Sequence, residues 1–474
     1  MSDKTVIVIG SGLAGLSAAL EAHHHGAKVI LIEKEKNIGG NSMKATSGIN
    51  AVGESDTAEA FLQDTLSSGG GLSNVKLVTK LVQESNDALK WLQEQDTTDS
   101  LQLSLVSQCG GHSNPRTHRC PPSNGAPVPV GWKLIDTLKK RILQEKIDIL
   151  TETRVSELML ESKRVVGVRI ARSSSDGTSK SEEVRADAVI LASGGFGGQT
   201  QNETFIEKYA PQLVHLATTN GPWADGSGIQ LGLAIGATTV DMEQVQIHPT
   251  GFVDPNQPEL NTKFLAPEAL RGYGAILMDT QGHRFANELA RRDELTDIIF
   301  KHTKEVPMDP PNSVFLVMTE EAVENFGRPT LEFYAKKGFF KKYQGITAVA
   351  KSLHIDQSQL ESEWSAYDEY SDGQVDPFGK IRFPCKLLSN KDSGCYWIAI
   401  ITPCVHYTMG GLQIDTDAAV QANGKPIPGL YAAGEVTGGV HGRNRLAGNS
   451  LLECVVFGRT AGRNAALHKS TSIQ

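Results

Sequence analysis

The sequence predicts an α/β protein in which one doubly wound domain is interrupted by an inserted α+β domain. Buried strands alternate with helices near the N-terminus, which is typical of a parallel sheet covered by helices. From about residue 243 to 407 the composition shifts toward aromatic residues, prolines and charged helices, and glycine-rich strand–turn–helix sequence returns at 429–463. We therefore expect segments 1–242, 243–407 and 408–474, of which the first and last form one domain.

The first elements of the chain read as a βαβ unit. Thr5–Ile9 is a continuous β-branched run, as expected of a strand buried on both faces. An alanine- and leucine-rich helix follows and ends near Gly26, and Lys28–Ile32 is a second buried strand. Two parallel strands joined by a helix in this way predict the start of a doubly wound sheet.

A GxGxxG sequence lies between the first strand and the first helix. Gly10 permits a tight turn, Gly12 lets the backbone approach a pyrophosphate, and Gly15 packs the helix against the strand. Glu33 ends the second strand, where a carboxylate accepts hydrogen bonds from ribose hydroxyls. Together these residues predict a dinucleotide site.

The elements that follow are less strongly marked. Helical periodicity runs through 56–95 and Lys133–Gln144, on either side of a loop rich in Gly, Pro and Ser at 107–131. The predicted strands are Arg154–Leu160, Val165–Ala171 and Ala188–Ala192, with Ser173–Ser181 as a hairpin turn.

Later segments favour a flavin over a nicotinamide as the bound nucleotide. Glycines and small hydroxyl residues between Gly39 and Asn50 suit a flat ring and its ribityl chain. Gly434 and Glu435 follow another strand, where an acid suits ribityl hydroxyls. Ser450 begins a helix whose N-terminus is suited to the negative edge of a reduced flavin.

Composition and charge exclude several classes of protein. Of the 474 residues, 21% are charged and 39% hydrophobic, as in folded globular proteins. The net charge of −8 (46 basic against 54 acidic residues) disfavours a nucleic-acid partner. No apolar run approaches the roughly 20 residues of a membrane span, and the first strand begins at Thr5, so we expect a cytoplasmic protein without a leader. The six cysteines lack CxxC spacing, so we expect reduced thiols and no metal site.

Six motifs, in order, resemble those of the flavoprotein subunits of fumarate reductases and succinate dehydrogenases. They are Gly39-Gly40-Asn41-Ser42, Ile247-His248-Pro249-Thr250-Gly251-Phe252, Glu268-Ala269-Leu270-Arg271-Gly272, Phe285-Ala286-Asn287-Glu288-Leu289 with Arg291-Arg292-Asp293, His406-Tyr407-Thr408-Met409-Gly410-Gly411, and Asn444-Arg445-Leu446. The resemblance covers nearly the whole chain and is strongest to the yeast-type soluble fumarate reductases and to the flavodomain of the trypanosomatid enzymes. It implies a Rossmann-like FAD-binding domain with an inserted α+β capping domain, and the reduction of fumarate to succinate.

The resemblance, with the glycine motif, implies FAD contacts along the whole chain. The expected contacts are Gly10, Gly12, Leu13, Ala14, Gly15, Glu33, Lys34, Gly40, Asn41, Ser42, Thr46, Ser47, Gly48, Val155, Ser193, Gly194, Gly195, Asn220, Asp225, Tyr407, Gly434, Glu435, Arg445, Gly448, Ser450 and Leu451. Respiratory members of the family attach FAD through a histidine near the position of Asn41. Because residues 39–53 contain no histidine, we expect FAD to be bound non-covalently.

Reduction of an activated double bond requires a hydride donor, cationic clamps for the carboxylates and a proton donor. The candidate clamps are His248, His406 and Arg445, each beside glycines or a proline. Arg445 is the best single anchor, because a guanidinium can hold a carboxylate through two parallel hydrogen bonds.

The proton donor is implied by the resemblance alone. Arg292 matches the catalytic acid of the family, with Glu268 and Arg271 as its proton relay. Glu268 and Arg271 are three residues apart, which places them on one helical face within pairing distance.

Other functions remain open at the level of sequence. The chain could reduce a related enoate of the urocanate or acrylate type, oxidise L-aspartate or succinate, or bind flavin without catalysis. The loop with His112 and Arg116 resembles one near the flavin in the family, and either gates the site or only fills space. No second nucleotide motif, CxxCH sequence or iron–sulfur cysteine run is present, so we expect an external electron donor: a reduced flavin, a reductase or domains outside this chain. If the donor is a set of domains outside this chain, the protein could also be located in an organelle.

Overall fold

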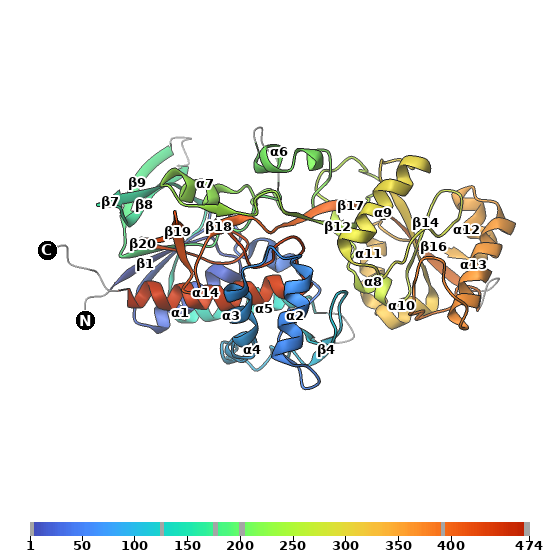
Figure 1. Cartoon of the computed structure of the whole chain (residues 1–474), viewed down its shortest axis with the longest axis horizontal. Helices are drawn as coiled ribbons and strands as arrows, with labels where there is room; N and C mark the ends of the chain where they lie inside the picture. Colours follow the sequence, from blue (N-terminus) through green and yellow to red (C-terminus); the bar gives the residue numbers. More distant parts are fainter. Residues whose placement is uncertain (1–3, 124–127, 174–178, 199–203, 390–393, 469–474) are drawn as a thin grey trace.

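The protein is described by a computed structural model that covers residues 4–123, 128–173, 179–198, 204–389 and 394–468. Figure 1 shows two bodies beside each other along the long axis. The N-terminal, middle and C-terminal segments form one body, and the stretch coloured yellow and orange forms the other.

The first body is built on a six-stranded sheet with the strand order β19-β20-β10-β1-β2-β6. β1 pairs in parallel with β2 on one side and with β10 on the other, so the chain winds outward in both directions from β1. β20 and β6 extend the parallel part, and β19 is antiparallel to β20. The strands are β1 Thr5–Ile9, β2 Lys28–Ile32, β6 Asp148–Leu150, β10 Ala188–Leu191, β19 Ala419–Ala422 and β20 Lys425–Ala432.

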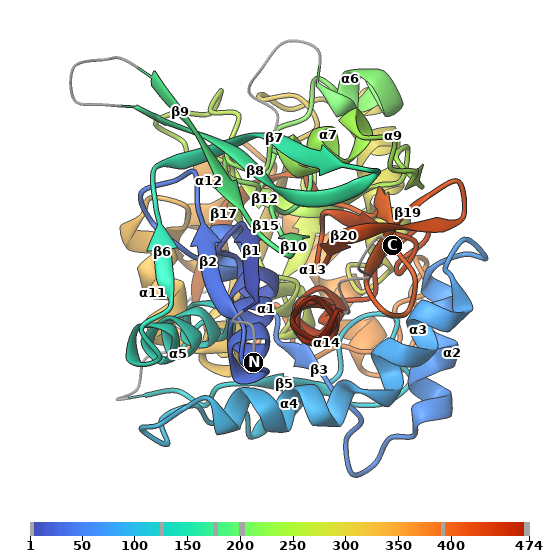
Figure 2. The same cartoon turned by 90° about the vertical axis from the view of Figure 1, so that its left-hand side faces the viewer.

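Helices cover one face of this sheet and a small antiparallel sheet covers the other (Figure 2). The helices are α1 Leu13–His24, α5 Val130–Gln144 and α14 Asn449–Leu467, and α1 packs along α14. The covering sheet consists of β7 Thr153–Glu161, β8 Arg164–Ser173 and β9 Ser179–Arg185. The central strands are therefore buried on both faces, which explains their continuous apolar sequence.

Shorter helices and strands complete this body. The helical ones are η1 Gly40–Lys44, α2 Ala58–Ser68, α3 Val75–Gln83, α4 Ser85–Glu94, α6 Phe205–Tyr209, η2 Pro211–Leu213 and α7 Ser227–Ala234. The strands are β3 Ile49–Asn50, β4 Leu105–Ser107, β5 Thr117–Arg119, β11 Thr239–Val240, β18 Gly411–Gln413 and β21 Thr437–Gly438.

The second body is built around an antiparallel sheet with the order β13-β12-β17-β15-β14, and β16 also pairs with β17. Its strands are β12 Val245–Phe252, β13 Phe264–Leu265, β14 Ile276–Met278, β15 Val314–Thr319, β16 Lys341–Gln344 and β17 Cys395–Thr408. Its helices are α8 Ala269–Gly272, α9 Arg292–Glu305, α10 Glu320–Phe326, α11 Arg328–Lys336, α12 Gly345–Leu353 and α13 Gln357–Ser371. Alternate residues of β15 enter two apolar cores, one on each face of the sheet.

The two bodies are joined by β12 and β17, which pair with each other and lead from the inserted body toward the first one (Figure 1). This pairing has two register shifts, one on each side of His248. Irregularities of this kind bend a strand and re-aim its side chains, so the sheet connection itself helps to set where His248 and His406 lie.

Several predicted boundaries were wrong. The helix expected from Lys133 begins at Val130, and the loop expected at 107–131 contains β5. β9 occupies part of the predicted turn Ser173–Ser181, whose residues 174–178 lie outside the described part of the chain. That turn lies between β8 and β9, which pair with each other. The hairpin between β7 and β8 is a separate one and closes at Ser162 and Lys163, both of which have positive φ. This turn contains no glycine, proline, asparagine or aspartate, and Ser162 alone is a weak turn signal.

Two composition-based expectations can be compared with the described residues. All six cysteines are unpaired in the structure. Within the described ranges, no helix combines the length and the apolar character that crossing a bilayer demands.

Candidate active site

A cavity of about 490 Å³ runs from the glycine motif at the end of β1 to the strands that join the two bodies. All but four of the predicted FAD contacts line it: the exceptions are Gly15, Gly195, Asp225 and Gly434. The cavity size is within the usual range of roughly 300–1,000 Å³ for small-molecule sites.

The end of the cavity at β1 has the geometry expected of a dinucleotide turn. Gly10 has a φ of +102°, a conformation that favours glycine. A Cβ on Gly15 would lie 1.8 Å from the carbonyl oxygen of Gly10, so the helix can approach the strand only because this residue has no side chain. Glu33 lines the cavity, and one of its carboxylate oxygens accepts hydrogen bonds from the backbone N–H (3.0 Å) and the hydroxyl of Ser11. Ser11 was not predicted.

The four exceptions support the wall of the cavity from behind. Gly15 packs α1 on β1, and Cβ atoms on Gly195 and Gly434 would lie 2.0 Å from Oγ1 of Thr408 and 2.9 Å from Cβ of Ala14. Asp225 forms an ion pair with Lys34, a cavity residue, at 2.7 Å. These residues therefore shape the site without lining it.

The middle of the cavity is organised around the side-chain amide of Asn41. Its Nδ2 donates to Oδ1 of Asn220 at 2.6 Å, and its Oδ1 accepts from the backbone N–H of Gly221 at 3.0 Å and from Nε1 of Trp223 at 3.1 Å. Trp223 also lines the cavity, as does Lys44, whose Nζ donates to the carbonyl of Thr219 at 2.6 Å. Trp223, Lys44 and Thr219 were not predicted from the sequence, because they contribute through contacts with distant segments and belong to none of the recognised motifs.

Buried polar atoms on the wall of the cavity indicate a polar ligand. Oγ1 of Thr46 and Oγ of Ser193 are buried, and neither has a hydrogen-bond partner among the described residues. A buried hydroxyl without a partner is costly, so the partner is expected to come from a bound molecule. Together with the glycine turn and Glu33, these hydroxyls fit a flavin dinucleotide.

The far end of the cavity contains three of the predicted substrate-site residues: Arg292, His406 and Arg445. His248 does not line the cavity but lies directly behind His406, with their ring centroids 5.2 Å apart. Nδ1 of His406 and Oγ1 of Thr219 form a hydrogen bond of 2.7 Å, which fixes one side of the imidazole ring.

The two histidines are not the cations that the sequence suggested. Burial, followed by the charge of Arg292, lowers the pKa of His248 well below its usual value. The same two causes, with a contribution from Arg445, act on the pKa of His406. Both rings are therefore neutral near pH 7, and they can meet a carboxylate only as neutral hydrogen-bond donors.

Arg445 remains a cation although it is buried. Burial and the nearby Arg292 lower its pKa only to about 10. Its guanidinium lies over the ring of Tyr407, with Cζ 4.6 Å from the centroid, and its backbone N–H donates to Oε1 of Gln246 at 2.9 Å. The hydroxyl of Tyr407 in turn donates to Glu453 at 2.6 Å. Tyr407 and Gln246 therefore fix the position of Arg445. Its buried Nε has no partner in the described part of the chain.

Arg292, at the far end of the cavity, contacts Glu268, its predicted relay partner. Nε of Arg292, the first residue of α9, donates to Oε2 of Glu268 at 3.2 Å. Although burial acts in the opposite direction, the charges of Arg292 and Arg271 lower the pKa of Glu268 to about 2, so the carboxylate is ionised. Nη1 of Arg292 is buried and has no partner among the described residues.

The expected pairing of Glu268 with Arg271 was wrong. No ion pair within 4.0 Å joins these two described residues; Nη1 of Arg271 donates instead to the carbonyl of Glu288. The reason is that α8 has only four residues, with Glu268 at its N-cap, and the Glu268 carboxylate contacts Arg292 and the N–H of Gly110. Burial lowers the pKa of Arg271. The charge of Arg271 still helps to lower the pKa of Glu268, although the two side chains form no ion pair.

Comparisons with known proteins agree with this geometry. The family model described as an FAD binding domain matches residues 5–451. The chain is 38% identical to the fumarate reductase of Schizosaccharomyces pombe, over 98% of this chain and 90% of that protein. It is 39% identical to fumarate reductase 1 of Saccharomyces cerevisiae, over 98% and 99% of the two chains.

A solved structure shares the whole architecture. The open conformation of a flavocytochrome c3 fumarate reductase superimposes with a TM-score of 0.78 and 34% sequence identity, covering 98% of this chain and 78% of the other. The family model, the two yeast proteins and this structure agree with one another and with the cavity. The chain therefore belongs to the FAD-binding fumarate reductase family of oxidoreductases.

Proposed function

We propose that the protein reduces fumarate to succinate with FAD as its redox cofactor. The observation that carries this proposal is that Arg292, His406 and Arg445 line one end of the same cavity whose other end carries the dinucleotide turn. The names of the two yeast relatives support fumarate as the substrate. Two buried cations and a neutral imidazole around one small volume suit a short dicarboxylate.

Arg445 is proposed as the anchor of one substrate carboxylate. The guanidinium lies over the ring of Tyr407, where a positive charge is favoured. Its buried Nε has no partner among the described residues and is available to donate a hydrogen bond to the substrate carboxylate. His406 donates to a carboxylate oxygen, and His248 supports His406 from behind through ring contact. As electrons enter the double bond, negative charge develops on a carboxylate, and these donors stabilise it.

Arg292 is proposed as the proton donor. FAD, when bound and reduced, supplies the hydride for one carbon of the double bond. Arg292 gives a proton to the other carbon, so that fumarate gains one hydride and one proton in total. Glu268, which is within hydrogen-bond distance of Arg292, takes a proton from solvent and returns it to the guanidine. Arg271 stabilises the ionised Glu268 without direct contact.

FAD is proposed to bind without a covalent bond. Residues 39–53 contain no histidine, and the Asn41 amide is engaged by Asn220, Gly221 and Trp223. His406 is the single histidine among the described lining residues, and it belongs to the substrate end. Electrons are proposed to come from an external donor, such as a reduced flavin or a separate reductase.

The proposal is tested by following the oxidation of reduced methyl viologen by the FAD-loaded protein under anaerobic conditions. Fumarate, urocanate, acrylate and buffer alone are compared, and succinate is quantified. We expect oxidation that depends on fumarate, with malonate as a competitive inhibitor. Faster turnover with urocanate or acrylate would show that another enoate, and not fumarate, is the substrate. In a separate aerobic assay, oxygen uptake with L-aspartate would indicate an oxidase.

A further inference from the structure

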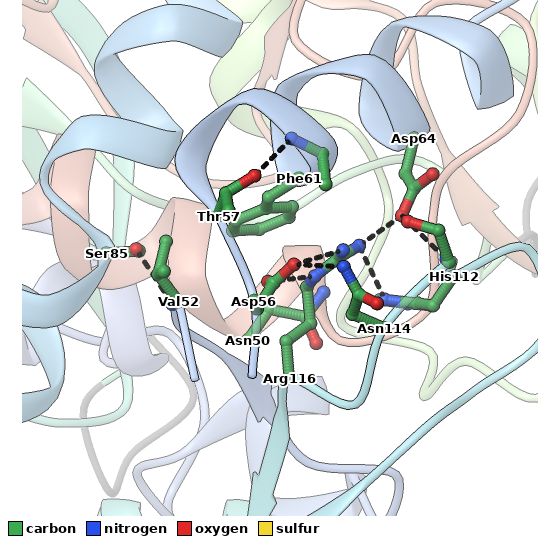
Figure 3. A network of polar contacts seen from close by, with 12 residues as sticks. Asn50, Val52, Asp56, Thr57, Phe61, Asp64, Ser85, His112, Asn114 and Arg116 are labelled. Atoms are coloured by element: carbon green, nitrogen blue, oxygen red, sulfur yellow. Dashed lines mark hydrogen bonds and ion pairs between the residues drawn. The ribbon is translucent and has the colours of Figure 1, made fainter. Parts of the chain in front are cut away.

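A buried cluster centred on Arg116 lies outside the cavity and has no part in the mechanism above (Figure 3). Arg116 is fully buried. It binds Asp56 through two hydrogen bonds, from Nε at 2.6 Å and from Nη2 at 2.9 Å, and its Nη1 donates to Asp64 at 2.5 Å. The guanidinium also lies over the ring of Phe61, 4.8 Å from the centroid. Asp56 precedes α2 and Asp64 is within it, so the cluster ties a single arginine to one helix.

The cluster fixes the loop that leads into Arg116. Both the backbone N–H and the hydroxyl of Ser113 donate to Asp64 at 2.8 Å, and Nδ2 of Asn114 donates to Asp56 at 3.0 Å. The two carboxylates are therefore shared between the arginine and the loop. A planar guanidinium with several bonds sets orientation as well as charge, so the loop has little freedom relative to α2.

One end of this loop holds the segment that carries Arg445. Nη1 of Arg116 can only donate, and it lies 3.1 Å from Nδ1 of His112, so Nδ1 must be the acceptor. Nε2 of His112 then carries the proton and donates to the carbonyl of Ala447 at 2.9 Å. The buried position of His112 and its neighbour Arg116 lower its pKa to about 4, which is consistent with this neutral tautomer. Ala447 is two residues from Arg445.

The other end of the loop contacts the proton relay in the inserted body. The backbone N–H of Gly110 donates to Oε1 of Glu268 at 2.9 Å, while Oε2 of the same carboxylate accepts from Arg292. Gly110 and His112 belong to one turn, because the N–H of His112 donates to the carbonyl of Cys109 at 3.3 Å. The turn thus connects Glu268 of one body with Ala447 of the other.

We propose that the turn formed by Cys109–His112, anchored by Arg116, is a positioning element that aligns Glu268 with Arg292 and at the same time fixes the segment carrying Arg445. Arg116 and His112 touch neither substrate nor cofactor in this scheme; they act through Gly110 and Ala447. The inference rests on the proposed function for its catalytic consequence, but the mechanical link between the two bodies is independent of the substrate.

Gly110→Ala is the sharpest test, because it perturbs one contact. A Cβ on Gly110 would lie 2.8 Å from Oε1 of Glu268, the end of a flexible side chain, and no other heavy atom lies within 3.5 Å of it. The variant should fold and bind FAD as the wild type does, yet displace the carboxylate. We expect kcat for fumarate to fall about tenfold or more with an unchanged KM. The solvent deuterium isotope effect on kcat should rise, since proton delivery becomes slower.

Exposed Ser104, on the same segment but outside the turn, gives the control variant Ser104→Ala. An unchanged kcat and an unchanged isotope effect in Gly110→Ala would overturn the catalytic role of the turn. A general structural defect would instead lower the melting temperature or the FAD content, and the proposal requires both to match the wild type.

Hydrogen–deuterium exchange on His112→Ala tests the mechanical link without any substrate. We expect faster exchange in peptides covering 108–116, 264–273 and 444–449, with α13 unchanged as an internal reference. Unchanged exchange at 264–273 and 444–449 would overturn the link. If the wild type fails to reduce fumarate while exchange accelerates as expected, the proposed function fails and the positioning element stands.

Discussion

Nε of Arg292 donates a hydrogen bond of 3.2 Å to Oε2 of Glu268, and of the two side chains that of Glu268 is the more exposed, at 20% against 8%. The pair therefore has a direction: Arg292 lines the cavity, and Glu268 is nearer to solvent. This order is what a relay that refills a proton donor from the outside requires.

Glu268→Gln should separate proton transfer from binding. The amide oxygen can still accept from the N–H of Gly110, but the side chain can no longer carry a proton. We expect kcat to fall about 100-fold, with little change in the KM for fumarate or in FAD content. Glu294→Gln on α9, at an exposed site, is the matched control and should retain wild-type kcat. Equal activity in both variants would exclude Glu268 from the relay.

Arg445→Lys should act mainly on substrate binding. A lysine keeps the charge but loses the paired N–H geometry and the planar contact with Tyr407. We expect the KM for fumarate to rise by about tenfold or more, equivalent to roughly 1.4 kcal/mol or more. Arg443→Ala, at an exposed cation two residues away, serves as the control, and its KM should be unchanged. If the KM for fumarate rose in Arg443→Ala alone, Arg443 and not Arg445 would be the residue that binds the substrate carboxylate.

The flavin should be released when the protein is denatured. Acid precipitation of the holoprotein is expected to leave FAD in the supernatant and a colourless pellet, because Asn41 offers an amide where covalent relatives have histidine. Flavin fluorescence that migrates with the denatured chain in a gel would contradict non-covalent binding.

The contribution of Glu435 to the stability of the apoprotein should decrease as the pH rises toward neutrality. Burial raises the pKa of Glu435 from its usual 4.5 to about 7, so the folded state holds a proton that the unfolded state releases. The resulting stabilisation is complete below about pH 4.5 and disappears as the pH rises through about 7. Glu435→Gln should therefore melt about 2 °C or more above the wild type at pH 8 and at the same temperature at pH 4.5. Glu259→Gln, at an exposed site, should show no such difference at either pH.

The sequence predicted the parts of the site that depend on local pattern. β1 and β2 have the bounds expected for them, and Gly10, Gly15 and Glu33 lie as a dinucleotide turn requires. A strand that is buried on both faces leaves a continuous apolar run, and a glycine turn has a fixed spacing, so both are legible in one short segment.

Contacts between distant segments were not predictable in the same way. The Asn41–Trp223 hydrogen bond joins residues 182 positions apart, and the Glu268–Gly110 bond joins residues 158 apart. The prediction that Arg271 pairs with Glu268 was wrong because it assumed regular helical spacing, whereas α8 has only four residues. The neutral state of His248 and His406 depends on burial beside Arg292, which becomes visible only once the chain is folded.

The most direct test of the account is a single-turnover experiment on Arg292→Ala. Holoprotein reduced with one equivalent of dithionite is mixed with fumarate in a stopped-flow instrument, and flavin reoxidation is followed, with Arg291→Ala as the exposed neighbouring control. We predict that Arg291→Ala reoxidises at the wild-type rate and that Arg292→Ala, with FAD still bound, is slower by about 1,000-fold. Reoxidation of Arg292→Ala at close to the wild-type rate would contradict the assignment of Arg292 as the acid.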